Sequence, residues 1–193
     1  MTRIDVIRHG EPEGGRRYRG HGVDDPLTET GWQQMWQAVD GQQCWTRIAS
    51  SPLQRCHAFA GQLAARLTVP ISVHDALKEI GFGAWEGKTP DEIVAANPDA
   101  LAHFYADPVH NRPAGAEPLD SFSQRVWGCY QTLYQQHPGE HILIVAHAGV
   151  ARAIAANVLN MSLENVYSRL GIAYGGIIRT QITDGNPPKL LIE

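Results

Sequence analysis

The sequence predicts a doubly wound α/β fold with three layers, α/β/α, a mostly parallel central sheet and a small helical lid insertion. Short apolar runs alternate with longer segments whose apolar residues recur at helical spacing, as in strands joined by helices. The run 142–146 is apolar on both faces, which is typical of a parallel strand buried between two helix layers. With 193 residues and 43% hydrophobic content the chain can bury a core, and we expect one domain over residues 1–193.

The first predicted strand, residues 4–7, brings Arg8 and His9 to its carboxyl end, where open α/β sheets bind ligands. A neutral imidazole is a nucleophile near pH 7, and a neighbouring guanidinium can hold a phosphate or carboxylate bidentately. The pair therefore indicates phosphoryl transfer through histidine. Gly10 lets the backbone come close to its neighbours. Asp5, inside the strand, has no partner that the sequence identifies.

Residues 28–31 open a predicted helix with an apolar stripe that continues to Val39, and a strand at 47–49 leads into the next helix. Ser51 is a good N-cap and Pro52 a good first helical residue, so we expect that helix to begin there and to direct its amides at the strand ends. Arg55 then lies in the first turn, where a cation is unfavourable unless an anion offsets it. We favour an anion contact for Arg55 over an ordinary place on the helix surface.

Glu79 begins a loop, 79–87, that is rich in glycine and contains two aromatic residues. Such a loop can hold a carboxyl in a partly apolar pocket, where burial raises the pKa and suits the group to donate a proton. Glu86 lies in the same loop and is the alternative proton donor. We favour Glu79.

A second histidine, His147, follows the 142–146 strand and precedes a helix, 150–159, that is apolar nearly all round. Its place at a strand's carboxyl end favours a role in the site over that of a structural histidine satisfied by the backbone. A metal site made of His9, His147 and a glutamate is a further alternative. Because the neighbouring arginines would repel a cation, we expect no metal and no cofactor.

The remaining expected elements are a strand at 69–73, a helix over 119–133, and strands at 174–182 and 189–192 on either side of a turn at 184–188. Between about 88 and 118 the pattern changes to short helical pieces, 91–96 and 99–106, broken by prolines. His103, Phe104, Tyr105 and His110 lie in this insertion. They either contact a ring of a ligand or form the insertion's own core, and we favour the core.

In this order and spacing, the Arg8-His9-Gly10 segment, residues 50–55, the Glu79 loop and His147-Ala148-Gly149 resemble the histidine phosphatase superfamily, the fold of cofactor-dependent phosphoglycerate mutase. The resemblance covers nearly the whole chain. It implies that His9 becomes phosphorylated, that Arg8, Arg55 and His147 hold the phosphoryl oxygens, and that Glu79 is the general acid and base. It also implies that the insertion caps the site and sets the substrate. A short lid favours hydrolysis, because a mutase must enclose its intermediate.

Residues 17–31 and 116–126 narrow the resemblance to the α-ribazole-5′-phosphate phosphatases of cobalamin assembly. The chain departs from the superfamily at Gly15, where an asparagine that touches the phosphoryl group is usual. Arg17 or Glu117 is the expected replacement. The expected substrate-binding residues are Gly10, Arg17, Glu117 and Ala148. The cluster of Arg16, Arg17 and Arg19 is equally well interpreted as a mobile solvated loop, because Gly14 and Gly15 precede it.

Composition excludes other classes of protein. The net charge is −4 and no long basic run occurs, which argues against nucleic-acid binding. No signal-peptide pattern is present, and no apolar stretch approaches the roughly 20 residues that span a bilayer. Cys44, Cys56 and Cys129 have no metal or disulfide spacing, which indicates reduced thiols in a cytoplasmic protein. We expect a monomer or homodimer that acts on a small phosphorylated metabolite.

The sequence thus predicts a metal-independent phosphomonoesterase with a phosphohistidine intermediate on His9 and α-ribazole 5′-phosphate as the candidate substrate. A phosphoglycerate mutase or a sugar-bisphosphate phosphatase is the alternative among enzymes. A catalytically silent module that binds a phospholigand is the alternative from another class. The complete set of His9, Arg8, Arg55, Glu79 and His147 argues against a silent module.

Overall fold

A six-stranded sheet with the order β3-β2-β4-β1-β5-β6 forms the middle layer of the computed structural model, which describes residues 1–167, 169–183 and 185–191. The strands are β1 (Thr2–Arg8), β2 (Arg47–Ser50), β3 (Ile71–Val73), β4 (His141–Ala146), β5 (Ile177–Ile182) and β6 (Lys189–Leu191). Strands β1 to β4 are parallel, and β5 and β6 add to one edge in antiparallel pairings. The predicted α/β class with a mostly parallel sheet is confirmed.

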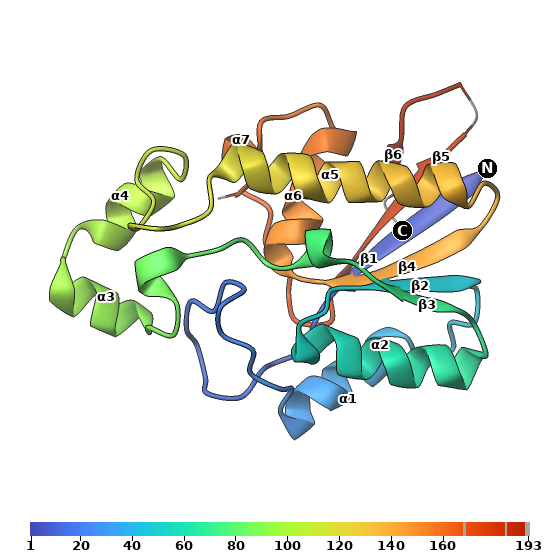
Figure 1. The fold of residues 1–193 in the computed structure, drawn as a ribbon, viewed down its shortest axis with the longest axis horizontal. Coiled ribbons are helices and arrows are strands. Elements are labelled where there is room, and N and C mark those ends of the chain that lie inside the picture. Colours follow the sequence, from blue (N-terminus) through green and yellow to red (C-terminus); the bar gives the residue numbers. More distant parts are fainter. Residues whose placement is uncertain (168, 184, 192–193) are drawn as a thin grey trace.

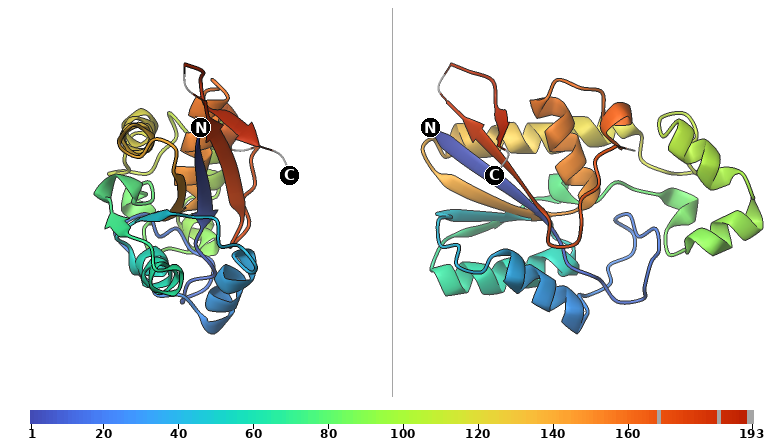
Figure 2. Two further views of the ribbon diagram at one scale, coloured as in Figure 1. Left: turned by 90° about the vertical axis from the view of Figure 1, so that its right-hand side faces the viewer. Right: turned by 180° about the vertical axis from the view of Figure 1, so that it is seen from behind.

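Helices cover both faces of this sheet (Figures 1 and 2). Helices α1 (Glu29–Ala38) and α2 (Gln54–Leu67) lie on one face, and α5 (Leu119–Gln136) and α6 (Ala148–Val158) lie on the other, followed by α7 (Leu163–Tyr167). Two short 3-10 turns, η1 (Asp75–Leu77) and η2 (Gly83–Trp85), flank Glu79. Helices α3 (Pro90–Ala96) and α4 (Ala100–Ala106) project beyond the carboxyl ends of the strands, in the predicted insertion (Figure 1).

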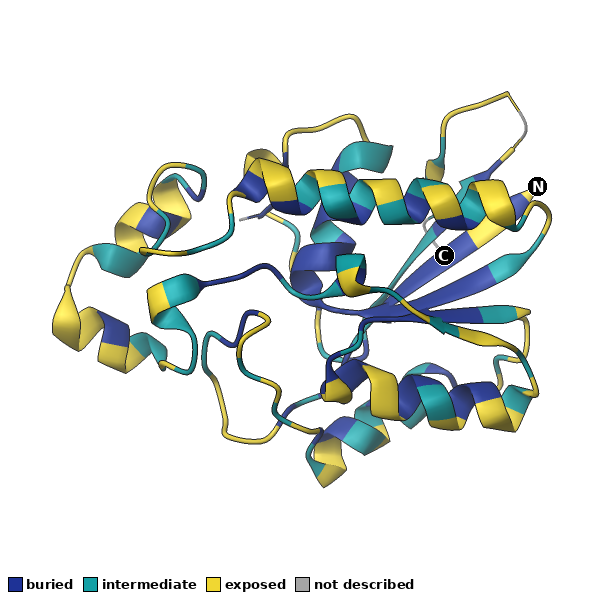
Figure 3. Ribbon diagram, in the orientation of Figure 1, coloured by how far each residue is buried: buried dark blue, intermediate teal, exposed yellow. Residues whose placement is uncertain are grey.

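Alternation along β4 explains why this strand is apolar on both faces. Ile142, Ile144 and Ala146 belong to the core cluster beneath α5 and α6, whereas Leu143 and Val145 belong to the cluster beneath α1 and α2. Each side chain therefore enters one of two cores. Figure 3 shows the resulting buried centre of the sheet. Among the described residues, no helix has the length and apolar character needed to cross a membrane.

Several predicted boundaries differ from the structure. Helix α2 begins at Gln54, two residues after the predicted start, because Asp24 Oδ1 accepts the Gln54 N–H at 2.7 Å and caps the helix from a distant loop. Strand β5 begins at Ile177 and not at residue 174 as predicted. The chain turns at Gly175, which adopts φ +71° and donates its N–H to Arg8 O. Residues 184 and 192, predicted in the closing turn and strand, lie outside the described residues.

The structure identifies the partners of Asp5. Its Oδ2 accepts hydrogen bonds from Trp45 Nε1 at 2.8 Å and from His141 Nε2 at 3.0 Å, and Arg179 Nε lies 4.0 Å away. Asp5 is 1% exposed, so these donors compensate a carboxylate inside a strand. They come from the residues before β2 and from the first residue of β4, which the sequence alone does not place beside β1.

We expect Trp45→Phe to lower the free energy of unfolding by about 1–3 kcal/mol, because it leaves a buried carboxylate without one of its donors. The expected phosphatase activity should be retained, since Asp5 precedes His9 by about 13 Å of strand at 3.3 Å per residue. Urea unfolding and steady-state assays measure both quantities. Trp36→Phe, at an indole that packs on Phe59, is the matched control. Equal stability of the two variants would show that the Asp5 hydrogen bond contributes little.

Candidate active site

Parallel pairing brings three strand ends together. In the register of the sheet Arg8 of β1 lies opposite Ala146 of β4, and Val145 of β4 lies opposite Ser50 of β2. The next residue of each strand is therefore His9, His147 or Ser51. The two histidine rings contact each other edge to face, with centroids 5.2 Å apart and an interplanar angle of 67°. The sheet thus assembles the two predicted histidines at one edge.

One nitrogen of the His9 imidazole donates a hydrogen bond, and the other has no hydrogen-bond partner among the described residues. Nδ1–H donates to Gly10 O at 2.7 Å, since a carbonyl can only accept, and no hydrogen bond from the described residues engages Nε2. Burial, followed by the nearby charge of Arg55, lowers the pKa of His9 well below its ordinary value of 6.5. The ring is therefore neutral, with its lone pair on Nε2.

His147 lies behind His9 and is fully buried. Its Nε2 is 2.8 Å from Ser51 Oγ and 3.6 Å from Cys56 Sγ. Burial and then Arg55 lower the pKa of His147 well below 6.5. A side-chain hydroxyl, rather than the backbone, satisfies this imidazole.

A buried guanidinium group, that of Arg55, and a half-buried one, that of Arg8, lie beside the histidines without a carboxylate partner among the described residues. Arg55 is 1% exposed, and its Nη1 and Nη2 donate to Val23 O and Gly20 O at 2.9 and 2.8 Å. Arg8 Nη1 donates to Ile172 O at 2.6 Å, and its guanidinium lies 4.0 Å above the Tyr174 ring. The Nε atoms of both arginines are buried and have no partner in the described chain. An ordinary surface position for Arg55 is therefore excluded.

Glu79 faces the amino end of α6. Gly149 N–H donates to Glu79 Oε2 at 3.2 Å, and Ile80 N–H donates to Oε1 at 3.0 Å. These two amides hold the carboxyl group of Glu79 at the start of the helix. A Cβ on Gly149 would collide with the carboxylate, so only glycine permits this approach. Glu86, the alternative donor, accepts from Phe82 N–H at 2.9 Å and does not line the cavity that contains His9.

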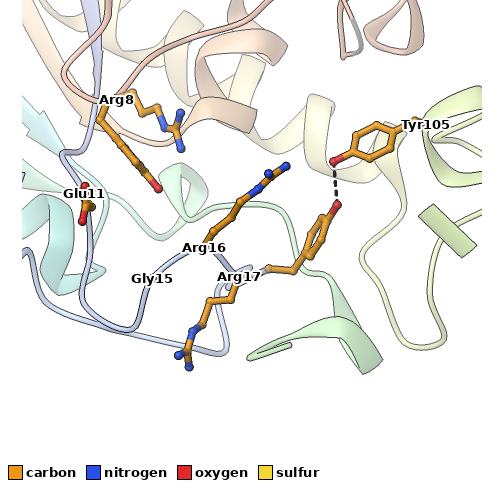
Figure 4. A pocket seen from close by; sticks show the side chains of 8 residues that line it. Arg8, Glu11, Gly15, Arg16, Arg17 and Tyr105 are labelled. Carbon is orange, nitrogen blue, oxygen red and sulfur yellow. Dashed lines mark hydrogen bonds between the residues drawn. The ribbon is translucent and has the colours of Figure 1, made fainter. Parts of the chain in front are cut away.

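An inner cavity of about 210 Å³ contains the site. It is lined by Arg8, His9, Arg17, Tyr18, Arg19, Gly20, Arg55, Glu79, Phe82, Phe104, Tyr105, Ala148, Gly149, Arg152, Tyr167 and Tyr174. An outer cavity of about 550 Å³ shares five of these residues and adds Glu11, Gly15 and Arg16 (Figure 4). The Tyr18 and Tyr105 hydroxyls are hydrogen-bonded at 2.7 Å, which joins the lid to the loop after His9.

Only some of the predicted substrate-binding residues reach these cavities. Ala148 lines the inner cavity, and Arg17 lines both, although its guanidinium donates to Gly14 O at 2.8 and 2.5 Å. The structure does not place Gly10 or Glu117 there. Gly10 instead approaches the backbone of Gly31, where a Cβ would collide with the carbonyl oxygen. Glu117 is engaged by Arg125 and by Gly81 N–H.

The three arginines of the loop after His9 make different contacts. Arg19 is buried, pairs with Asp25 at 2.8 Å and donates to Gly15 O at 2.8 Å, so it holds the loop together. Arg17 bends back along the loop, whereas Arg16 is exposed and points toward the space between Arg8 and Tyr105 (Figure 4). A fully solvated loop is therefore not what the structure shows.

The four residues singled out in the lid differ in burial. Phe104 is fully buried, as a core position should be, whereas His103 and His110 are exposed and line a separate cavity behind the lid. Tyr105 is 49% exposed and lines both site cavities. Because Phe104 belongs to the main core cluster and also lines the inner cavity, these four residues do not form the expected private core of the insertion.

The inner cavity is also lined by residues to which the sequence assigned no role, among them Tyr18, Arg152, Tyr167 and Tyr174. Arg152 had a detectable signal, because it is the single charged residue of the apolar segment 150–159. Its Nε donates to Leu170 O at 2.8 Å, and its guanidinium lies 5.3 Å from the Tyr167 ring. Within the described residues, no group of three or more histidine, cysteine or acidic side chains is placed to hold a metal ion.

The two buried histidines predict a pH-dependent stability. Their pKa values lie well below 6.5 in the folded protein and return to about 6.5 in the unfolded chain. The unfolded chain therefore binds protons that the folded protein does not, and their stabilisation is complete above pH 6.5 and lost as the pH falls toward the folded-state values. Each group contributes a slope of up to about 1.4 kcal/mol per pH unit.

Urea unfolding on either side of pH 6.5 measures this slope. His9→Gln and His147→Gln should each flatten the pH dependence of the unfolding free energy, and the double variant should flatten it further. If all three variants keep the wild-type slope, other groups are responsible for the titration.

Three relatives share sequence with the chain. A bifunctional protein of Mycobacterium tuberculosis is 33% identical over 151 residues, which cover 76% of this chain and 41% of that protein, so the chain spans less than half of that relative. The metal-independent phosphoserine phosphatase of Arabidopsis thaliana is 28% identical over 185 residues, 88% of this chain and 77% of that protein. The adenosylcobalamin/alpha-ribazole phosphatase of Escherichia coli is 26% identical over 170 residues, 86% and 83% of the two chains.

Solved structures share the fold. The mycobacterial glucosyl-3-phosphoglycerate phosphatase in complex with VO3 has a TM-score of 0.88 and 25% identity, covering 98% of this chain and 97% of that chain. The phosphoserine phosphatase of Entamoeba histolytica in complex with 3-phosphoglyceric acid has a TM-score of 0.83 and 25% identity. The match covers 98% of this chain and 95% of that chain. The sequence also matches the histidine phosphatase superfamily (branch 1) over residues 4–192. The chain therefore belongs to the histidine phosphatase superfamily.

Proposed function

We propose that this protein is a metal-independent phosphomonoesterase in which Nε2 of His9 attacks phosphorus and carries a phosphohistidine intermediate. The hydrogen bond from His9 Nδ1–H to Gly10 O carries the proposal, because it sets the tautomer that leaves the Nε2 lone pair for attack. The lowered pKa of His9 keeps this lone pair unprotonated near neutral pH.

The two arginines supply the charge that the phosphoryl group requires. Arg8 and Arg55 keep unsatisfied buried N–H groups beside His9, and a bound phosphate dianion would accept from them. His147 supports the edge of the His9 ring. It does not line the inner cavity, and its Nε2 lies 2.8 Å from Ser51 Oγ, so we propose that it orients His9 instead of making the predicted contact with the phosphoryl group. A largely buried cationic pair without carboxylate partners is a site for an anion.

Glu79 is the proposed proton donor. As Nε2 bonds to phosphorus, the bond from phosphorus to the leaving oxygen breaks and Glu79 gives that oxygen its proton. The resulting carboxylate then removes a proton from water, whose oxygen attacks phosphorus and breaks the bond to Nε2. Inorganic phosphate leaves, and both side chains return to their starting forms. The short lid and the continuous inner and outer cavities admit water, which favours hydrolysis over transfer to a second substrate.

For the leaving group we propose α-ribazole 5′-phosphate, which places the protein in cobalamin assembly. The outer cavity supports a large aromatic leaving group, because Tyr18, Tyr105 and Tyr174 line it together with Arg16. The E. coli relative carries the same substrate in its name. Phosphoserine, from the names of other relatives, is the competing candidate and is much smaller than this cavity.

We expect His9→Ala to abolish both turnover and the acid-labile phosphoenzyme, because the nucleophile is lost. Trapping with labelled substrate in the presence of EDTA measures the intermediate and tests metal independence in the same experiment. His57→Ala, at an exposed histidine, is the control and should form normal phosphoenzyme. Covalent phosphate retained by the His9 variant, or wild-type labelling that requires added metal, would overturn the mechanism.

We expect Glu79→Gln to slow phosphoenzyme formation from alkyl phosphates by about 10²–10⁴-fold, the usual contribution of general acid catalysis. p-Nitrophenyl phosphate should be affected much less in this step, since its leaving group needs little protonation. Rapid quench of the burst phase separates the two esters. Equal losses for both would remove Glu79 from the role of acid, and Glu86→Gln is the matched control from the same loop.

The substrate assignment is tested by comparing kcat/KM for α-ribazole 5′-phosphate and phosphoserine. Tyr105→Ala should lower the value for the aromatic ester by about 2- to 10-fold, the range expected for one aromatic contact. Tyr105→Phe retains the ring and loses only the hydroxyl contact with Tyr18, so it should keep most of the activity. A preference of the wild type for phosphoserine would contradict the assignment and leave the phosphohistidine mechanism intact.

A further inference from the structure

The side chain of Arg125, on α5, binds the backbone that leads to Glu79. Its Nη1 donates to Ala76 O at 2.7 Å and to Lys78 O at 2.9 Å. Its Nη2 lies 3.3 Å from Glu79 O. One guanidinium therefore contacts three carbonyl oxygens within four consecutive residues. Arg125 itself does not line either site cavity.

Glu117 completes the arrangement from the other side of Glu79. Its carboxylate accepts from Arg125 Nε at 2.7 Å and from Nη2 at 2.8 Å, a bidentate ion pair. Glu117 Oε2 also accepts the Gly81 N–H at 3.1 Å. The ion pair thus holds the backbone before Glu79 through the arginine and the backbone after it through the glutamate.

Two further contacts restrain the same segment. His21 Nδ1 lies 3.0 Å from Glu79 O, and Arg112 Nη2 donates to Gly81 O at 3.1 Å. The Arg125 guanidinium is 4.8 Å from the Phe122 ring, which lies against Gly149 at the amino end of α6. The ion pair therefore lies next to the two parts of the backbone that hold the Glu79 carboxylate, the 76–81 segment and the amino end of α6.

The carboxylate of Glu79 depends on this backbone for its position. Among the described residues, the hydrogen bonds to its oxygens come from two backbone amides, those of Ile80 and Gly149. A shift of the 76–81 segment would move the carboxylate away from α6. Displacing a catalytic group by about 1 Å can cost about 100-fold in rate.

We propose that the Arg125–Glu117 ion pair is a positioning device that holds the Glu79 carboxylate against the leaving group. Neither residue touches substrate; each acts through the loop. The proposal rests on the proposed role of Glu79 as proton donor. Glu117 then has a positioning role, whereas the sequence predicted a contact between Glu117 and the phosphoryl group.

The test compares phosphoenzyme formation from an alkyl phosphate and from p-nitrophenyl phosphate in Arg125→Lys. Lysine keeps the charge, but one ammonium cannot reach the carboxylate and the carbonyls together. We expect the alkyl phosphate to slow by about 10- to 100-fold and the activated ester to change much less, as in Glu79→Gln. Adding Glu79→Gln to Arg125→Lys should cost far less than Glu79→Gln costs alone, because the two changes disable one function.

Arg47→Gln is the matched control. Arg47 pairs with Glu140 at 3.2 Å, and its side chain is 23% exposed, against 24% for Arg125, but it lies at the start of β2. It should leave the ratio of the two ester rates unchanged. Glu117→Gln, which keeps the shape of the side chain and loses its charge, provides the same comparison if Arg125→Lys does not fold.

The outcomes separate this proposal from the function on which it rests. If Glu79→Gln separates the two esters but Arg125→Lys and Glu117→Gln slow both equally, the ion pair is merely structural and the proposal fails. If Glu79→Gln itself does not separate them, the proton donor has been misassigned and the proposed mechanism fails first.

Discussion

The parallel pairing of β1 with β4 is the constraint on which the site depends. Because both strands end at the same edge, the register that places Arg8 opposite Ala146 also places His9 beside His147. The backbone N–H of His9 donates to Ala146 O at 2.9 Å, so the pairing continues one residue past the strand. A slip of one residue would turn His9 toward the opposite face of the sheet. The proposed nucleophile is therefore placed by backbone hydrogen bonds, before any side-chain contact is made.

The electrostatics of the site follow from this geometry. Arg8 and Arg55 are held by carbonyl oxygens rather than carboxylates, so their charges stay available to a ligand. The same charges, together with burial, disfavour protonation of His9. Both properties fit the proposed reaction, in which the charged arginines attract the phosphoryl group and the neutral imidazole keeps a free lone pair. The folded protein retains unsatisfied donors at the place where a dianion would bind.

Glycine permits the close approaches that complete the site. Gly149 allows the Glu79 carboxylate to reach the amino end of α6, and Gly10 allows the loop after β1 to lie against Gly31 at the start of α1. Arg19 and its carbonyl contacts then shape the loop that carries Tyr18 to the lid. The catalytic edge and the substrate cavity are thus joined through one loop.

The sequence by itself determined the α/β class, the order of the elements and the grouping of His9, His147, Arg55 and Glu79, because strand ends, helix starts and apolar periodicity are local patterns. It did not reveal the partners of Asp5, the true start of α2 or the task of Glu117. Each of these depends on residues far away in the chain: Trp45 and His141 for Asp5, and Asp24 for α2. The sequence gives the type and charge of each side chain, but its hydrogen-bond partners depend on which groups the fold brings within reach. Tertiary structure alone decided which donors and acceptors met.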